Sequence, residues 1–236
     1  MEPVTLQFIA EASQGTLRPS EADCLKASRV CTDSRHLRPG DLFVALRGER
    51  FDGHDFLKDP GLKTASAVVV SQDRLPEVPQ GMPTVSVRDT REALGLIAAA
   101  YRNRFSLPVF CVAGSNGKTT TKELLAALLE TRFPTLRSQA SFNNDIGVPL
   151  SLLNLEGAHQ AAVLEAGTNH PGELAPLVRL IAPRYGVVPQ IGREHLEHFG
   201  DLEGVIAEES ALGEGLPHDG VLFLNGDCAA ARPLAS

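Results

Sequence analysis

A glycine-rich turn followed by a lysine and two threonines is the part of this sequence best suited to chemistry. The segment consists of Gly114, Ser115, Asn116, Gly117, Lys118, Thr119 and Thr120. An apolar run over residues 108–113 predicts a buried strand before it, and apolar residues at helical spacing predict a helix after it. The first N–H groups of a helix lack partners within the helix and lie at the positive end of its dipole, so this order of elements favours phosphate binding. In such a loop Lys118 reaches the outer phosphates, and the Thr119 hydroxyl is a ligand for Mg²⁺.

The match to the phosphate-loop pattern is incomplete. The full pattern has a glycine five residues before the second glycine, and Val112 stands at that position. The alternative is an ordinary strand-to-helix turn that carries an exposed lysine. We favour nucleotide binding because a strand precedes the turn and the helical pattern follows it, with apolar residues at Leu124, Leu125, Leu128 and Leu129.

A glutamate ends the next clearly apolar strand. The run 161–166 predicts a buried strand, and Glu165 lies at its carboxyl end. Ligands of open α/β sheets bind beyond the carboxyl ends of the strands, so this carboxylate is a candidate Mg²⁺ ligand beside the phosphates. The alternative is a solvated glutamate at the end of a strand. We favour the metal role because the flanking residues are small and apolar, and a buried carboxylate needs a partner.

Two further polar sites reach the same edge of the predicted sheet. His195 follows the strand expected over 185–188 and could bind a metal or orient a phosphate; the residues alone leave its role open. Asn143 and Asn144 lie in a polar loop over 139–144, where their amides could bind phosphate or substrate. Asparagine is also common in turns, so these two could serve the loop alone.

The order of elements predicts an α/β protein with two domains. From residue 107 onward, strands and helices alternate with short connections, which indicates a mainly parallel sheet. Strands are also expected over 41–46 and 65–70, ahead of a cluster of prolines and glycine over 75–83. We therefore place a smaller domain at 1–83 and the phosphate-loop domain at 84–236.

Composition excludes several classes of protein. The 236 residues carry a net charge of −7 without a cluster of basic residues, which argues against a nucleic-acid-binding surface. The four cysteines lack paired or zinc-type spacing and are expected as free thiols. Neither a signal-peptide pattern nor an apolar run long enough for a membrane span occurs in the sequence. We expect a cytoplasmic monomer without membrane insertion.

Several motifs together resemble a known family. The phosphate-loop segment is followed by Asn-Asn-Asp-Ile-Gly-Val-Pro-Leu at 143–150, by Glu-Ala-Gly-Thr-Asn-His-Pro-Gly-Glu at 165–173, and by His-Leu-Glu-His-Phe-Gly at 195–200. This order is similar to that of the Mur ligases of peptidoglycan synthesis. The segments 32–35 and 39–56 resemble the uridine-binding domain of the two members that add the third residue and the terminal dipeptide. The resemblance covers nearly the whole chain.

The resemblance implies a small uridine-binding domain followed by an ATP-binding domain with a phosphate loop. It implies an ATP- and Mg²⁺-dependent amide-bond ligase of the 6.3.2 class, which joins D-alanyl-D-alanine to UDP-N-acetylmuramoyl-tripeptide through an acyl phosphate. A close alternative is the ligase that adds the third amino acid, although the motif at 143–150 disfavours it. Another is a non-catalytic fragment that binds a nucleotide or a UDP-sugar.

The family's residue roles carry over to matching positions. The loop from Gly114 to Thr120 would bind ATP, with Lys118 neutralising charge on the phosphates. Thr119 and Glu165 would hold one Mg²⁺, and His195 would help to place a second. The resemblance also puts Asn143 and Asn144 near the phosphates and the substrate, and Ser34 and Arg35 at the UDP end of the substrate. The catalytic residues that it implies are Lys118, Asn144, Glu165 and His195.

The sequence departs from the family in two respects. The family usually carries a carbamylated lysine fourteen residues after the motif histidine, where this chain has Glu209. Glu209, or its neighbour Glu208, could supply the carboxylate without modification; the alternative is a solvated helix face. The family also has a third, carboxy-terminal domain for which we expect no counterpart here, so that this sequence is interpreted as a fragment or a truncated gene product with an incomplete central sheet. We therefore expect this chain alone to ligate nothing.

Overall fold

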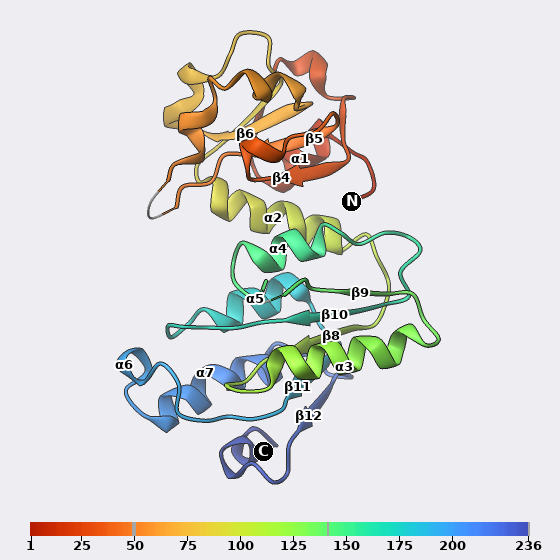
Figure 1. Ribbon diagram of the computed structural model, residues 1–236, viewed down its shortest axis with the longest axis vertical. Coiled ribbons are helices and arrows are strands. Elements are labelled where there is room, and N and C mark those ends of the chain that lie inside the picture. Colours follow the sequence, from red (N-terminus) through yellow and green to blue (C-terminus); the bar gives the residue numbers. More distant parts are fainter. Residues whose placement is uncertain (49–50, 141, 236) are drawn as a thin grey trace. The chain divides into compact units, whose positions relative to one another are not determined.

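The computed structural model describes residues 1–48, 51–140 and 142–235. It divides the chain into two compact units, Met1–Tyr101 and Arg102–Ser236. Figure 1 shows helices and strands mixed in both units, which confirms the predicted α/β class. None of the helices in these described ranges has the length and apolar character needed to cross a membrane.

The first unit is built on a mixed sheet with the strand order β2-β7-β6-β5-β4. Its elements are β1 (Val4–Thr5), α1 (Leu6–Ala12), β2 (Thr16–Arg18), β3 (Lys26–Ala27), β4 (Arg29–Cys31), β5 (Asp41–Val44), β6 (Ala67–Ser71), β7 (Thr84–Val87) and α2 (Thr90–Arg102). Short 3-10 turns occupy Ser20–Ala22, Ser34–His36, Gly53–Phe56, Pro60–Thr64 and Gln72–Glu77. β4 to β7 run parallel, β2 pairs antiparallel with β7, and β1 pairs with β3 in a separate ribbon.

The boundary of the first unit lies later than residue 83, where the proline and glycine cluster suggested it. β7 pairs with β6 on one side and with β2 on the other, so a division before Thr84 would cut the sheet. The cluster instead connects two neighbouring strands. The unit continues through α2, whose start is capped: the Asp89 carboxylate accepts from the N–H groups of Arg91 and Glu92.

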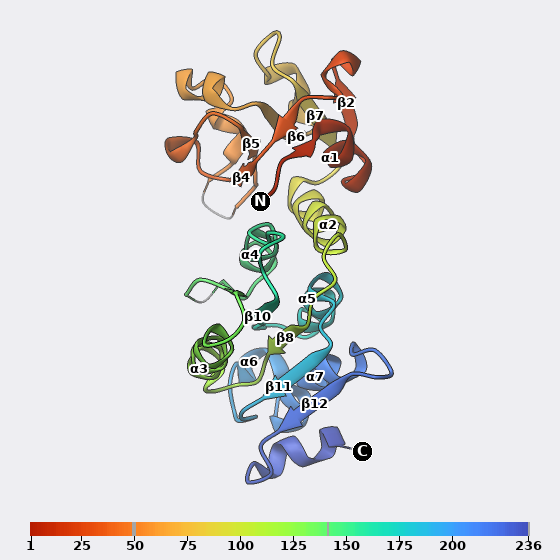
Figure 2. The same cartoon turned by 90° about the vertical axis from the view of Figure 1, so that its right-hand side faces the viewer.

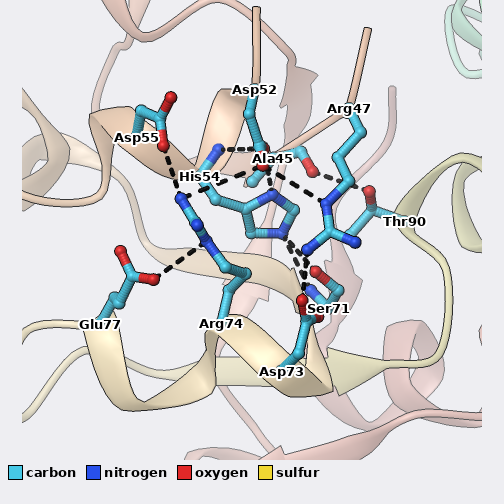
Figure 3. A network of polar contacts seen from close by, with 10 residues as sticks. All are labelled: Ala45, Arg47, Asp52, His54, Asp55, Ser71, Asp73, Arg74, Glu77 and Thr90. Carbon is cyan, nitrogen blue, oxygen red and sulfur yellow. Dashed lines mark hydrogen bonds and ion pairs between the residues drawn. The ribbon is translucent and has the colours of Figure 1, made fainter.

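A buried histidine fixes the loop that follows β5 (Figure 3). The Ser71 backbone N–H donates to His54 Nε2 over 3.0 Å, and Asp52 Oδ1 lies 2.5 Å from His54 Nδ1. Because a backbone N–H can only donate, Nε2 carries no proton and Nδ1–H donates to Asp52. The imidazole therefore joins this loop to the end of β6.

The second unit has a parallel sheet with the strand order β12-β11-β8-β10-β9. Its elements are β8 (Val109–Val112), α3 (Lys118–Glu130), β9 (Thr135–Arg137), α4 (Gly147–Leu152), β10 (Ala161–Glu165), α5 (Leu174–Ile181), β11 (Tyr185–Val188), α6 (Leu196–Phe199), α7 (Leu202–Glu214), β12 (Val221–Leu224) and a 3-10 segment, Ala229–Ala235. The chain adds β9 and β10 on one side of β8 and β11 and β12 on the other. This reversal makes the carboxyl end of β8 the switch point at which α/β sheets bind ligands.

Helix α3 and helix α5 lie on opposite sides of this sheet (Figure 2). On the α3 side, Leu125 and Leu129 pack against a core that includes Val112 and Val163. Leu124 and Leu128, expected on the same apolar face, are instead 67% and 69% exposed. The helical spacing was correct, but the buried stripe is rotated by one position and includes Lys122 and Ala126.

Candidate nucleotide and metal site

The phosphate loop joins β8 to α3, as the sequence predicted, and two glycines determine its shape. Gly114 has φ +114°, and a Cβ there would lie 2.7 Å from the Gln190 carbonyl oxygen. Gly117 has φ +81° and directly precedes the first residue of α3. Val112, where the full pattern has a glycine, is the buried last residue of β8. The turn thus begins two residues later than the pattern assumes.

The loop is fastened to the segment that follows β11. The Ser115 N–H donates to the Gln190 carbonyl over 2.8 Å. The Ser115 hydroxyl donates to the Gly192 carbonyl (3.1 Å) and accepts from the Gly192 N–H (2.9 Å). Ser115 therefore shapes the loop with its side chain, while Asn116 and Thr120 are exposed.

The ammonium group of Lys118 folds over the loop from the start of α3. Its Nζ donates to the carbonyl oxygens of Gly114 (2.5 Å) and Ser115 (3.2 Å). The positive charge is thus held at the helix N-terminus, where the unpaired N–H groups also attract an anion. This is the place that the sequence assigned to the outer phosphates.

Three residues predicted separately meet at the carboxyl end of β10. The exposed Thr119 hydroxyl donates to Glu165 Oε2 over 2.9 Å, and Asn143 Nδ2 donates to Glu165 Oε1 over 2.9 Å. Glu165 itself is buried. Gly167 permits this approach, because a Cβ there would lie 2.8 Å from Asn143 Nδ2. A hydroxyl and a carboxylate beside a phosphate loop are oxygen ligands of the kind that Mg²⁺ takes together with phosphate oxygens and water.

The neighbouring Asn144 has a different environment from Asn143. Its Oδ1 accepts from the N–H groups of Gly147 (2.8 Å) and Ile146 (3.2 Å), and so caps the start of α4. The catalytic role expected for Asn144 stays a prediction, whereas the contact with Glu165 belongs to Asn143. Helix α4 begins at Gly147 and includes Pro149 in its first turn, where proline is tolerated.

The two glutamates of α7 have separate environments. Glu208 accepts from the Thr168 hydroxyl and from the N–H groups of Gly172 and Leu174, so its carboxylate holds the start of α5. Glu209 is 2% exposed, and the Gly114 N–H of the phosphate loop acts to lower the pKa of its carboxyl. Its Oε2 has no hydrogen-bond partner within the described residues. Glu209, unlike Glu208, thus has an oxygen that remains open to a ligand at the loop.

Burial determines the acidity of Glu209. Removal from water raises the pKa of this carboxyl to about 7; the charge of Glu194 acts in the same direction, and that of Lys118 opposes it. A buried carboxylate with an open oxygen near a lysine fits a site that receives a cation, since a metal ion would offset the cost of burying the charge.

His195 lies outside this group of contacts. It has φ +47° just before α6, its side chain is 39% exposed, and its Nδ1 lies 3.8 Å from Glu197 Oε1. No hydrogen bond or ion pair of the described residues joins it to Thr119 or Glu165. Across the ranges 1–48, 51–140 and 142–235, no three His, Cys, Asp or Glu side chains are arranged to hold a metal by themselves. A metal here therefore needs Thr119, water and phosphate oxygens as ligands.

Ser34 and Arg35 belong to the first unit, in the 3-10 turn Ser34–His36. The Arg35 guanidinium is largely exposed and pairs with Asp33 at 2.7 Å, which holds the pKa of the Asp33 carboxyl well below its usual range. Their expected contact with the UDP end of a substrate stays a prediction. Glu49 and Arg50 of the motif at 39–56 lie outside the described residues.

Lys122 was missed by the sequence interpretation. It is fully buried beside Glu165, one helical turn beyond Lys118 and Thr119. The spacing of four and three residues, which places side chains on the same face of a helix, was the signal that could have found it.

Known proteins share both the motifs and the fold. Residues 112–236 match the family described as Mur ligase middle domain, and residues 26–102 match the family described as Mur ligase family, catalytic domain. This chain belongs to the Mur ligase family. Each matched range falls in one compact unit, except that Arg102, the last residue of the first range, belongs to the second unit.

Two sequence relatives named UDP-N-acetylmuramoyl-tripeptide–D-alanyl-D-alanine ligase illustrate the relationship. The Escherichia coli protein is 40% identical over 96% of this chain and 49% of its own length, and the Bacillus subtilis protein is 37% identical over 94% and 49%. A crystal structure of MurF from Acinetobacter baumannii matches with a TM-score of 0.90 at 35% identity, over 99% of this chain and 51% of that one. MurF from Thermotoga maritima, solved in complex with ADP, matches with a TM-score of 0.78 at 31% identity, over 87% and 47%. The chain spans about half the length of these Mur ligases.

Proposed function

We propose that this chain provides the UDP-substrate-binding and ATP-binding parts of a ligase that adds D-alanyl-D-alanine to UDP-N-acetylmuramoyl-tripeptide. The contact between Thr119 and Glu165, directly after the phosphate loop at the switch point of the sheet, carries the proposal. It supplies oxygen ligands for a metal at the place where the loop would hold the phosphates of ATP. The names of the relatives support the choice of D-alanyl-D-alanine over a single third amino acid.

The proposed reaction has two steps. The terminal carboxylate of the tripeptide attacks the γ-phosphorus of ATP, and ADP leaves. The amine of D-alanyl-D-alanine then attacks the resulting acyl phosphate and displaces inorganic phosphate, which leaves the new amide bond. Phosphoryl transfer depends on positioning and on neutralising charge. In this chain, the Lys118 ammonium and the N–H groups at the start of α3 perform that neutralisation.

Mg²⁺ fits the residues around the loop. Thr119 and Glu165 would hold one ion, and that ion would neutralise phosphate charge when bound. Glu209 supplies a further carboxylate oxygen, and His195 would take part if a second ion binds. The partner-free Oε2 of Glu209 supports a direct role for this glutamate where the family carries a modified lysine.

The remaining features of the proposal concern the whole protein. The first unit would bind the UDP end of the substrate through Ser34 and Arg35, and the second would bind ATP. The protein would act in the cytoplasm as a monomer, without nucleic acid or membrane insertion. This chain corresponds to about half the length of its relatives, and ligation itself would also require residues of the other half.

Calorimetric titration tests these assignments separately. We expect this chain to bind Mg-ATP, and to bind UDP-N-acetylmuramoyl-tripeptide more tightly than the corresponding dipeptide derivative. Lys118→Ala should remove Mg-ATP binding and leave binding of the UDP-linked ligand intact. A preference for the dipeptide derivative would favour the ligase that adds the third amino acid. If neither UDP-linked ligand nor Mg-ATP binds to folded chain, the proposed function is wrong.

A further inference from the structure

A buried lysine lies behind the candidate metal site. Lys122 is on α3, and its side chain is 0% exposed. Burying an ammonium group is costly unless its donors find acceptors, and Lys122 finds three. Its Nζ donates to the carbonyl oxygens of Ser138 (2.9 Å) and Ala140 (2.8 Å) and lies 3.0 Å from Glu123 Oε1. The ammonium thus makes two hydrogen bonds and one ion pair.

The segment bound by Lys122 leads directly to Glu165. The Ser138 hydroxyl accepts from the Glu165 N–H over 3.2 Å, and Asn143 donates to the Glu165 carboxylate. The Asn143 carbonyl also accepts from the Gly167 N–H over 2.9 Å. Ala140, whose carbonyl Lys122 holds, has φ +42°, a conformation that a residue with a Cβ adopts only when its surroundings enforce it.

The Lys122 ammonium group does not donate a hydrogen bond to the Glu165 carboxylate. Nζ lies 4.0 Å from Glu165 Oε2, beyond hydrogen-bonding distance, and that oxygen already accepts from Thr119. The contacts of Lys122 with Ser138 and Ala140 are shorter. The hydrogen bonds of Lys122 therefore act on Glu165 through the segment they hold, in addition to the direct attraction between the two charges.

We propose that Lys122 is a positioning residue that fastens the segment carrying Ser138 and Asn143 to the phosphate-loop helix, and thereby orients Glu165 for Mg²⁺. Asn143 holds Oε1 of Glu165, which leaves Oε2 facing Thr119. Without Lys122, the carbonyls of Ser138 and Ala140 lose their buried donor, and the segment loses its attachment to α3. The expected effect of Lys122 on nucleotide binding rests on the proposed function. The expected effect on the segment 138–143 does not.

The test compares Lys122→Met with a matched control. Methionine keeps the apolar stem but removes all three donors. Arg137→Met removes a cation that also pairs with Glu123, at 3.1 Å, but that makes no hydrogen bond to Ser138 or Ala140 in the described part of the chain. Calorimetry on folded protein should show Mg-ATP affinity lowered about tenfold by Lys122→Met, ATP affinity without metal changed less than twofold, and both unchanged in Arg137→Met.

Hydrogen exchange tests the attachment without any ligand. In Lys122→Met, the amides of Glu165 and Gly167 should exchange about tenfold faster, whereas the Ala113 amide, bonded to Val187, should keep its protection. If wild-type chain binds no Mg-ATP, the proposed function fails and the exchange rates still decide the role of Lys122. Unchanged exchange at both amides would overturn the proposal, as would a fall in stability with unchanged Mg-ATP affinity.

Three further variants keep the test decisive. Asn143→Ala should weaken Mg-ATP binding, and adding Lys122→Met to it should cause little further loss if Lys122 acts through this segment. If Lys122→Met does not fold, Lys122→Arg retains the charge and several donors in a planar head that fits the two carbonyls less well. It should lower Mg-ATP affinity about threefold, and wild-type affinity in folded Lys122→Arg would contradict the proposal.

Discussion

The Thr119 hydroxyl donates to Glu165 Oε2 over 2.9 Å, which joins the first turn of α3 to the carboxyl end of β10. The two residues are 46 positions apart in the chain. They meet because β8 and β10 are neighbours in a parallel sheet, so the loops that follow them lie at one edge.

Glu165→Gln should weaken Mg-ATP binding by tenfold or more while leaving the fold intact. Glutamine has nearly the same shape and can still accept from Thr119, but it lacks the negative charge that a hard cation prefers. Titration calorimetry with and without Mg²⁺ measures the effect. Glu130→Gln, an exposed change at the far end of α3, serves as the control. Equal Mg-ATP affinities in the two variants would show that Glu165 is not a metal ligand.

Gly114→Ala should destabilise the protein by roughly 2–4 kcal/mol, because the new Cβ combines a left-handed backbone with a clash against the Gln190 carbonyl. Gly172→Ala is a matched control: its φ is +86°, but a Cβ added there would meet no atom within 4 Å beyond its chain neighbours. It should cost about 1 kcal/mol. Urea unfolding measures the free energy of unfolding of both variants. An equal loss of stability in Gly172→Ala and Gly114→Ala would mean that the clash contributes nothing.

His54→Ala should destabilise the first unit by about 2–4 kcal/mol. The change opens a cavity and leaves the buried N–H of Ser71 without an acceptor, while Asp52 loses the donor at Nδ1. His36→Ala, which removes an exposed imidazole paired with Asp33, should change stability by less than about 0.5 kcal/mol. Thermal unfolding monitored by circular dichroism compares them. Similar melting temperatures for the two variants would argue against a structural role for the buried network.

The sequence predicted the strands that position the site more reliably than the contacts within it. β11 begins and ends at the predicted residues, because short apolar runs bounded by turn residues define buried strands well. The apolar face of α3 was less well predicted: Leu124 and Leu128 are exposed, since helical spacing shows a period but not which stripe meets the sheet.

Tertiary pairing explains the remaining differences. The pairing of β7 with β2 cannot be read from local composition, so the boundary was placed at the proline-rich loop before β7. The different environments of Asn143 and Asn144 depend on how the loop meets Glu165 and α4. A lysine in a helix is usually exposed to solvent, so the burial of Lys122 was not predicted. Only the fold reveals the carbonyl oxygens that accept its hydrogen bonds.

Glu209 should make the stability of the protein fall between about pH 4.5 and pH 7. Its pKa is raised from 4.5 to about 7 in the folded state, so the folded chain holds this proton more tightly than the unfolded chain. Below pH 4.5 the carboxyl is protonated in both states and burial carries no charge penalty. As the pH rises from 4.5 through 7, the unfolded chain loses the proton before the folded chain does. The free energy of unfolding therefore falls, by on the order of 3 kcal/mol in total.

The variant Glu209→Gln isolates this contribution, since the amide has no charge to lose. Its free energy of unfolding relative to wild type should be near zero at about pH 4.5 and should favour the variant by a few kcal/mol near pH 8. Urea unfolding at several pH values measures the difference, which cancels the titration of other groups. Glu208→Gln should behave oppositely, with a loss of stability at all these pH values, because that carboxylate holds N–H groups of Gly172 and Leu174. A Glu209→Gln difference that does not change with pH would mean that this carboxyl is solvated rather than buried beside Lys118.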